Sequence, residues 1–267
     1  NDNWDFNPYA FQYDMSVYLT LSSVDNKSIT DISNYQIAAF CNDECRGIAE
    51  ERVIGEHKYL YLRVRSNSTE GDIINFKVKN RTTEKILKVT ETLEFKSQQI
   101  IGFPSTPFVL NARNIYSVTF IIDGVEHRSD LYFGDIITIP TITNKEGYSF
   151  IDWNPYVDAT VPDHDVTYTA IYSINQYKVT FVAEGVIVFE DLLNYGSQII
   201  IPDAPDKEGY SFSTWGEVEE TVPNHDVTYT AVYEINKYLL EYYVDGELYY
   251  NDSVAYGAAL HIPKEPE

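Results

Sequence analysis

The chain repeats a pattern of aromatic residues and glycines with a fixed period of 61 residues. Such a period is typical of tandem structural modules strung along one protein. A catalytic site is seldom built twice in tandem, so the period favours a scaffold over an enzyme. The recurring positions are Tyr116, Phe120 and Gly124, then Tyr177, Phe181 and Gly185, then Tyr238, Tyr242 and Gly246.

Longer motifs recur inside the first two copies and set the expected boundaries. The sequence KEGYSF stands at 145–150 and again at 207–212, and HDVTYTA stands at 164–170 and 225–231. We predict a first domain over 1–113, repeats over 114–174 and 175–235, and a truncated third repeat over 236–267. The third copy stops before these two motifs, so we expect the chain to be cut from a longer protein.

The composition favours β-strands. Aromatic residues make up 15% of the chain, 23 of them are tyrosines, and methionine occurs once. Aromatic side chains are enriched in strands, and long Leu/Ala-rich windows with helical spacing are absent from the sequence. The expected fold class is therefore mainly β. No stretch approaches the roughly 18 apolar residues that a transmembrane helix needs.

The formal net charge of −22 is unevenly distributed along the chain. Residues 1–113 hold 13 Lys and Arg against 15 Asp and Glu, whereas residues 114–267 hold 6 against 26. A surface of this sign repels phosphate backbones and anionic lipids. We therefore expect neither nucleic acid nor a membrane surface as a partner.

The first 113 residues alternate apolar and polar side chains in short runs that are separated by polar turns. This spacing is typical of an antiparallel β-sandwich. Over residues 59–64, alternation sends one set of side chains toward a core and the other set outward. The inward set is Leu60, Leu62 and Val64, and the outward set is Tyr59, Tyr61 and Arg63.

Each repeat opens with a predicted hairpin whose turn is Asp123-Gly124 in the first copy and Glu184-Gly185 in the second. Glycine supplies the positive φ that a tight hairpin turn requires. The aromatic segment that follows is expected to fill a small core in each repeat. Its members are Tyr148, Phe150 and Trp153 in the first repeat and Tyr210, Phe212 and Trp215 in the second.

The repeats resemble the Listeria-Bacteroides repeat, also called the internalin B-repeat. The likeness rests on YxVTF, a following DG or EG, then YG, a proline, EGYxFxxW and HDVTYTAxY. It implies a β-grasp-like module of exported or surface-attached bacterial proteins, acting as a spacer or an interaction unit without catalysis. In the second repeat the matching residues are Tyr177, Phe181, Gly185, Tyr195, Gly196, Pro202, Gly209, Tyr210, Phe212, Trp215, His225, Asp226, Tyr229 and Tyr233.

The first domain is similar to β-sandwich domains that precede such repeats in secreted surface proteins of gut Bacteroidales. The likeness rests mainly on Ala38-Ala39-Phe40 followed by Glu44-Cys45-Arg46-Gly47, and Cys41 departs from that pattern. It implies adhesion or glycan contact outside the cell. We therefore expect an extracellular or cell-surface protein whose partner is a host surface protein or a glycan.

Cys41 and Cys45 stand four residues apart, which permits a small disulfide if their Cα atoms lie within about 7 Å. The exported setting that the resemblance implies favours oxidation. Two buried free thiols are the equal alternative. We expect no metal site and no cofactor, because no second Cys/His pair has zinc-ligand spacing.

His164-Asp165 and its copy His225-Asp226 follow a proline in loops that lead into strands. A metal role would need further converging carboxylates, and Asn224 replaces the Asp163 of the first copy. Turn capping by these aspartates is therefore the favoured interpretation.

Tyr59, Tyr61, Arg63 and Arg65 are the candidate ligand-binding residues. Outward tyrosines beside arginines can form an aromatic surface on which sugar rings stack. The alternative is that cross-strand tyrosine pairs only stabilise an exposed sheet face. The hypothesis is thus a non-enzymatic adhesion protein with spacer repeats, and the alternatives are a pure spacer or an accessory region of a secreted glycoside hydrolase.

Overall fold

The computed structural model of the chain describes residues 4–55, 57–142 and 144–264. The mainly β prediction is confirmed, since strands dominate and the described residues contain only two short 3-10 helices, η1 (Pro8–Ala10) and η2 (Ile32–Asn34). Among those residues, no helix has the length and apolar character of a membrane span. The chain divides into two compact units, 1–141 with 153–170 and 142–152 with 171–267, so the division runs through the first repeat.

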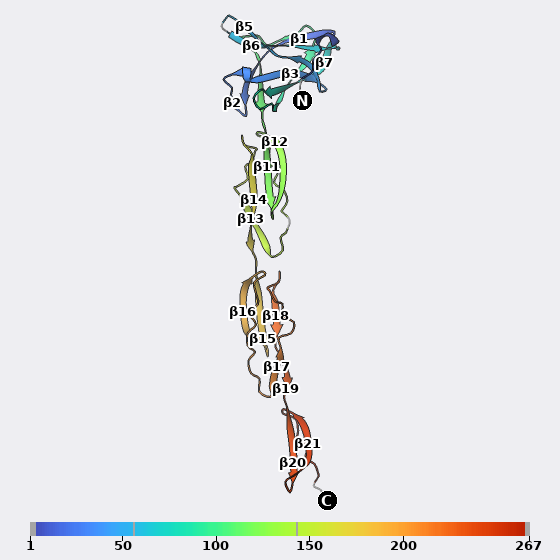
Figure 1. The fold of residues 1–267 in the computed structure, drawn as a ribbon, viewed down its shortest axis with the longest axis vertical. Helices are drawn as coiled ribbons and strands as arrows, with labels where there is room; N and C mark the ends of the chain where they lie inside the picture. Colours follow the sequence, from blue (N-terminus) through green and yellow to red (C-terminus); the bar gives the residue numbers. More distant parts are fainter. Residues whose placement is uncertain (1–3, 56, 143, 265–267) are drawn as a thin grey trace. The chain divides into compact units, whose positions relative to one another are not determined.

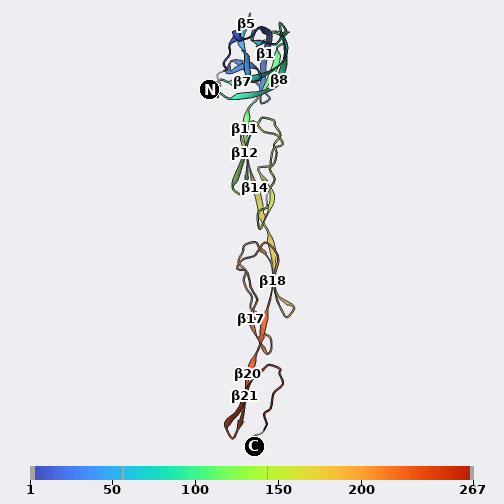
Figure 2. The same cartoon turned by 90° about the vertical axis from the view of Figure 1, so that its right-hand side faces the viewer.

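The first domain is built on one ten-stranded sheet. Its main path runs in the order β4-β3-β7-β8-β10-β1-β6-β5, and β2 and β9 both pair with β1. Both views of the fold show strands β1, β5 and β7 within this first domain (Figures 1 and 2). The strands are β1 (Tyr13–Val24), β2 (Lys27–Ser28), β3 (Tyr35–Cys41), β4 (Glu44–Ile48), β5 (Glu50–Ile54), β6 (His57–Ser66), β7 (Glu70–Asn80), β8 (Ile86–Lys96), β9 (Ile100–Ile101) and β10 (Phe108–Arg113).

This sheet departs from the antiparallel sandwich that the spacing predicts. Strand β1 is antiparallel to β6 but parallel to both β9 and β10. The hydrogen bonds also join the strands into a single sheet, whose two halves contribute to one core. Alternation along a strand determines which side chains share a face, and it carries no information about strand direction.

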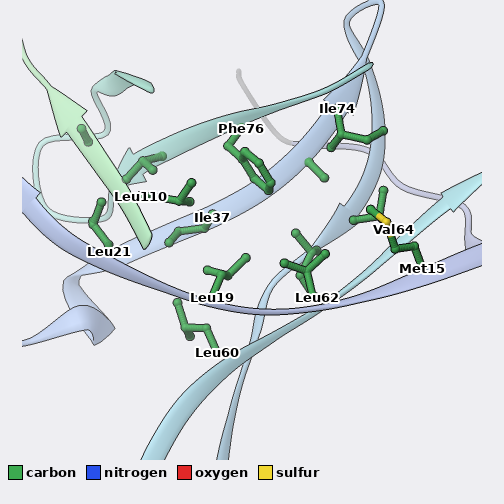
Figure 3. Close-up of a cluster of buried hydrophobic side chains, with 14 of the residues drawn as sticks. Met15, Leu19, Leu21, Ile37, Leu60, Leu62, Val64, Ile74, Phe76 and Leu110 are labelled. Atoms are coloured by element: carbon green, nitrogen blue, oxygen red, sulfur yellow. The ribbon is translucent and has the colours of Figure 1, made fainter. Parts of the chain in front are cut away.

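The core of the first domain contains the inward set of β6. Leu62 and Val64 are fully buried, and Leu60 is nearly so. Figure 3 shows these three side chains in one cluster of buried apolar side chains. The labelled members contributed by the other strands are Met15, Leu19, Leu21, Ile37, Ile74, Phe76 and Leu110.

Strand β4 lies against β6 at Gly47. A Cβ atom on Gly47 would sit 2.3 Å from the backbone oxygen of Arg63, which no side chain can tolerate. Glycine is therefore required here for the close approach of two backbones. This contact brings β4, near one end of the sheet path, next to the strand that carries the candidate ligand-binding residues.

The first repeat forms a four-stranded mixed sheet in the order β12-β11-β14-β13. Strands β11 and β12 make the predicted hairpin, and both residues of its Asp123-Gly124 turn have positive φ. Strand β14 runs parallel to β11 on its other side. The strands are β11 (Ile115–Ile122), β12 (Val125–Tyr132), β13 (Tyr148–Asn154) and β14 (Val166–Ile174).

The second repeat has the same hairpin and the same parallel third strand, in the order β16-β15-β18. Its remaining strands, β17 and β19, form a separate two-stranded sheet, and a further hairpin, β20 and β21, follows. The strands are β15 (Gln176–Ala183), β16 (Val186–Asn194), β17 (Tyr210–Thr214), β18 (Val227–Thr230), β19 (Val232–Ile235), β20 (Lys237–Val244) and β21 (Glu247–Ala255).

One aromatic triad lies in the interior of each of these two repeats. In the first, the Phe120 ring lies 4.8 Å from Trp153 and 5.3 Å from Tyr168 between centroids. In the second, Phe181 lies 5.1 Å from Trp215 and 5.0 Å from Tyr229. Trp153 and Trp215 are only 7% and 5% exposed, so both indoles belong to packed interiors.

The expectation that the whole aromatic segment fills the core is wrong for two of its members. Phe150 and Phe212 are 36% and 42% exposed, and Tyr148 and Tyr210 are half-buried. Phe212 pairs directly with Tyr233 across the two-stranded sheet, and a sheet of two strands buries little of its surface. The fully interior partner is instead the tyrosine of HDVTYTA, Tyr168 or Tyr229.

Candidate ligand-binding groove on the first domain

The outward face of β6 carries the four candidate ligand-binding residues on alternate positions. Strand β6 pairs with β1 on one side and with β5 on the other. Tyr61 is flanked by Tyr18 on β1 and by Glu50 on β5, and Arg52 lies opposite Tyr59. The pairing therefore adds β5 side chains to the face that the β6 residues form.

A groove of about 530 Å³ opens on this face, and we call it the arginine groove. Tyr61, Arg63 and Arg65 line it, so three of the four candidate residues lie in one site. Tyr59 lines a neighbouring depression instead. The other residues of the arginine groove are Glu50 and Arg52 from β5, Ile48, and Phe6 and Pro8 from the N-terminal segment.

The tyrosines of this face are held by contacts within the protein. The Tyr18 ring lies 5.6 Å from Tyr59 and 5.5 Å from Tyr61, and the Ser16 hydroxyl is 2.9 Å from the Tyr61 hydroxyl. The Arg52 guanidinium carbon lies 4.0 Å from the centre of the Tyr61 ring. Because a cation already covers one face of this ring, Tyr61 is a poor surface for stacking a sugar.

The arginines of the groove differ in how their charges are balanced. Arg63 forms an ion pair with Asp14 at 3.1 Å, and Arg52 forms one with Glu50 at 3.4 Å. Arg65 is half-buried and has no ion pair within the described part of the chain. Its Nε atom is buried and has no hydrogen-bond partner among the described residues. The groove thus holds one guanidinium whose charge is not balanced.

Arg46 of β4 contacts the backbone of Arg65. Arg46 donates from Nη1 to the Arg65 carbonyl oxygen at 3.4 Å, and its own charge is balanced by Glu44 at 3.1 Å and Asp72 at 3.4 Å. The Arg46 guanidinium also lies over the Phe11 ring at 5.0 Å. Arg46 therefore helps to position the strand that carries Arg65, and its own charge is already compensated.

Sequence reasoning missed Glu50 and Arg52 as groove residues. The signal that would have found them is the short link at Gly55, which has positive φ and joins β5 to β6. A hairpin about this glycine sets the register in which Arg52 faces Tyr59 and Glu50 faces Tyr61. Phe6 and Pro8 lie far from β6 in sequence, and no local pattern connects them to it.

Cys41 and Cys45 are both buried free thiols, so the disulfide alternative is not what this structure contains. In the β3-β4 hairpin, Cys45 pairs with Phe40 while Cys41 pairs with Glu44. Cys41 packs into the main core, and Cys45 packs with Ala38 and Phe40 in a separate cluster. The two side chains point to opposite faces, so a bridge would require backbone movement. Burial raises the pKa of both thiols.

The aspartates of the HDVTYTA motif tie strands together. Asp165 Oδ1 accepts a hydrogen bond from the backbone N–H of Ser117 at 2.8 Å, and Asp226 Oδ1 accepts one from Lys178 at 2.8 Å. The role is structural, but the turn-capping interpretation is wrong about the partner, because the bonded N–H lies on the first strand of the repeat and not in the local turn. No group of three or more potential metal ligands occurs among the described residues.

Three asparagines that the sequence reasoning did not single out recur at the same 61-residue period: Asn114, Asn175 and Asn236. Each backbone oxygen accepts a hydrogen bond, at 2.8–2.9 Å, from the aromatic residue before the Gly of the YG or FG pair. Each backbone N–H donates at 2.8 Å to an oxygen from the preceding module. We call these places joints. The aromatic donors are Phe133, Tyr195 and Tyr256.

The two later joints, both inside the second unit, use glycine. The acceptor for Asn175 is the carbonyl oxygen of Gly147, and that for Asn236 is the carbonyl oxygen of Gly209. Both glycines have positive φ, and a Cβ on either would lie 1.9 Å from the ring of Tyr195 or Tyr256. In both joints, a tyrosine ring packs directly against the backbone of a glycine.

The first joint, inside the first unit, uses a buried carboxylate instead. Asp25 accepts hydrogen bonds from the backbone N–H of Asn114 at 2.8 Å, from its Nδ2 at 2.8 Å and from the Tyr116 hydroxyl at 2.7 Å. Burial, followed by the Asp25 carboxylate, raises the pKa of Tyr116 above its ordinary value. Arg113 also pairs with Asp135 at 2.7 Å. These contacts attach the first repeat to the first domain.

Comparison with known proteins identifies the repeats. The family described as the Listeria-Bacteroides repeat domain matches residues 116–172 and 177–236. A putative membrane protein of Evansella cellulosilytica is 31% identical over 177 residues, which are 58% of this chain and 26% of that protein. A putative Gly-rich membrane protein of the same organism is 32% identical over 144 residues, 49% of this chain and 16% of that protein.

A third relative is internalin H of Listeria monocytogenes, which is 30% identical over 109 residues, 38% of this chain and 20% of that protein. The chain thus spans about a quarter or less of the curated relatives that it matches. The sequence motifs, the hairpin that opens each repeat and the residues that the family matches all support one assignment. Residues 116–172 and 177–236 are two Listeria-Bacteroides repeats.

Proposed function

We propose that this chain is a non-catalytic part of an exported, cell-surface protein, in which the first domain binds a ligand and the repeats act as spacer modules. The observation that carries the proposal is the arginine groove, where the half-buried Arg65 side chain has no ion pair among the described residues. A pocket with a few convergent polar groups is the usual form of a binding site. The partner is a host surface protein or a glycan.

The repeats support a structural role. Their recurring aromatic residues are used in two interiors, and their recurring asparagines and glycines are used in joints. The aspartates of the repeated motif accept backbone hydrogen bonds. The two aspartates of the repeated motif therefore already have structural partners.

The relatives support a location at the cell surface. Two of them are named as putative membrane proteins, and the third is named internalin H. A protein of this kind would display the first domain outside the cell. The acidic repeats, with a net charge of −20 over residues 114–267, would repel one another and resist aggregation.

The test is binding of the whole chain to a glycan array and to immobilised matrix proteins. The wild type is compared with the double variant Arg63→Ala/Arg65→Ala and with the control Arg128→Ala. Arg128 matches Arg63 closely, since both are exposed arginines in a single ion pair, at 3.2 and 3.1 Å. We expect a ligand that the control retains and the double variant loses. If neither panel contains a ligand, the alternative that the chain is a pure spacer remains.

A further inference from the structure

We propose that the arginine groove recognises an acidic sugar, and that the Arg65 guanidinium binds its carboxylate or sulfate group. This inference rests on the proposed function, because it assumes that the groove is the ligand site of the first domain. It adds the chemical class of the ligand. The reasons are the charge balance of the groove, the burial of Arg65 together with its lack of an ion pair among the described residues, and the polarity of the walls.

The charge balance of the groove leaves room for an anion. Three guanidiniums line it, against one lining carboxylate, Glu50. Asp14 lies outside the lining and is already paired with Arg63. A ligand with a single negative charge would therefore complete the set of counter-charges.

Arg65 is prepared for a planar anion. Its strand is held at the backbone by Arg46, and its half-buried side chain lines the groove without an ion pair among the described residues. A guanidinium presents donors in a rigid fork that matches a carboxylate or a sulfate better than an ammonium does.

The walls of the groove favour a sugar over a peptide side chain or a lipid. Their apolar part is small and consists of Phe6, Pro8 and Ile48. Glu50 is 71% exposed at its side chain and can accept hydrogen bonds from hydroxyl groups. The Tyr61 ring is covered by Arg52, so recognition would depend on polar contacts more than on ring stacking.

The charge of the rest of the chain makes this groove distinctive. The formal net charge is −22, so the chain as a whole repels anions, and an acidic ligand can bind only where local cations outweigh that field. Binding through a half-buried guanidinium would resist salt better than binding to exposed lysines. The affinity should therefore fall only modestly between low and physiological ionic strength.

The experiment is titration of the full chain with small probes, followed by calorimetry or ligand-observed NMR. The acidic probes are glucuronic acid, N-acetylneuraminic acid and galactose 6-sulfate, which separate carboxylate from sulfate. The controls are glucose, galactose and an acetylated, amidated triglutamate peptide. The proteins are the wild type, Arg65→Ala, Arg65→Lys and the control Arg128→Ala, each checked for an unchanged thermal transition.

We expect at least one acidic sugar to bind, the neutral sugars not to bind, Arg65→Ala to weaken binding by about tenfold or more, and Arg65→Lys to retain part of it. Arg128→Ala should bind as the wild type does. Equal binding of neutral sugars, or binding that Arg65→Ala leaves intact, would overturn the inference while the array result keeps the ligand-binding function. Preference for the triglutamate peptide would replace the sugar by an acidic protein. If no probe binds, the inference fails, and the array and matrix panels then decide the proposed function separately.

Discussion

The first domain and the repeats are both built from strands, but they place their polar residues differently. The first domain encloses one broad core, has a net charge of only −2 over residues 1–113, and gathers three arginines in a groove on its outer face. Each repeat encloses one aromatic triad and directs its recurrent polar residues to backbone partners. The difference teaches that repetition here preserves interiors and joints, and it is consistent with our proposal that ligand recognition lies where the sequence does not repeat.

The joints make the same comparison at a finer scale. Asn114, Asn175 and Asn236 each need an acceptor for a backbone N–H. Within the repeats a glycine carbonyl supplies it, whereas the first domain supplies the side chain of Asp25. At the first joint, the carboxylate of Asp25 thus takes the place of the glycine carbonyl oxygen that accepts the hydrogen bond at the two later joints.

Replacing the interior tryptophan should have the largest effect on stability. Trp215→Ala should destabilise the second repeat by about 3–5 kcal/mol, because it removes the indole that packs on Phe181. Phe212→Ala is the matched control, since Phe212 is 42% exposed and should cost much less. Differential scanning calorimetry of the full chain measures both. Equal losses would show that the repeat interior is not organised around the tryptophan.

Removing the carboxylate of the first joint should cost somewhat less. Asp25→Ala leaves the Asn114 N–H and the Tyr116 hydroxyl without their acceptor, and we expect a loss of about 3 kcal/mol in the coupling of the first domain to the first repeat. Chemical unfolding followed by tyrosine fluorescence measures it. Asp43→Ala, at an exposed ion pair with Lys77 and with a positive φ like that of Asp25, should cost at most about 1 kcal/mol. If Asp25→Ala costs no more than the Asp43→Ala control, the first joint contributes no more than an ordinary surface contact.

At the glycine joints, the cost of a left-handed backbone can be separated from the cost of a clash with the tyrosine ring. Gly209→Ala should destabilise by about 2 kcal/mol, since it combines a left-handed backbone with a clash against the Tyr256 ring. Gly216→Ala has a similar positive φ but open space around its Cβ, so it should cost only about 1 kcal/mol. Urea unfolding of both variants gives the difference. If the two variants lose the same stability, the ring on the glycine contributes nothing.

The smallest expected effect is a pH dependence from the interior tyrosine. Burial, followed by the hydrogen bond to Glu219, raises the pKa of Tyr229 from 10.0 to about 12. A raised pKa means that the unfolded state loses its proton first, so this stabilisation is complete below pH 10 and is lost as the pH rises toward about 12. Stability curves of the wild type and Tyr229→Phe should therefore converge over this range. Parallel curves would contradict the shift.

Local patterns predicted those features that depend on neighbouring residues. Alternation gave the inward set of β6, and the Asp123-Gly124 pair gave a hairpin turn with positive φ. Features that depend on distant pairing were not predictable in this way. Strand β10 is parallel to β1, Arg52 reaches the groove through its register with β6, and Phe212 stays exposed because its sheet has two strands.

The candidate site divides along the same line. Three of its four predicted residues, Tyr61, Arg63 and Arg65, line one groove because they share a face of one strand. The interpretation of the tyrosines as a stacking surface does not fit, since Arg52 comes from another strand and covers Tyr61. Sequence alternation thus located the face, and tertiary pairing determined its chemistry.

The most direct test of the central claim is the ligand affinity of the full-length Trp215→Ala chain, measured beside Arg65→Ala with the ligand found on the array or among the acidic sugars. Trp215→Ala should lose the thermal transition of the second repeat and keep the wild-type affinity, while Arg65→Ala should keep every transition and bind about tenfold or more weakly. Loss of affinity in Trp215→Ala, with Arg65→Ala binding normally, would contradict the account by placing recognition in the repeats.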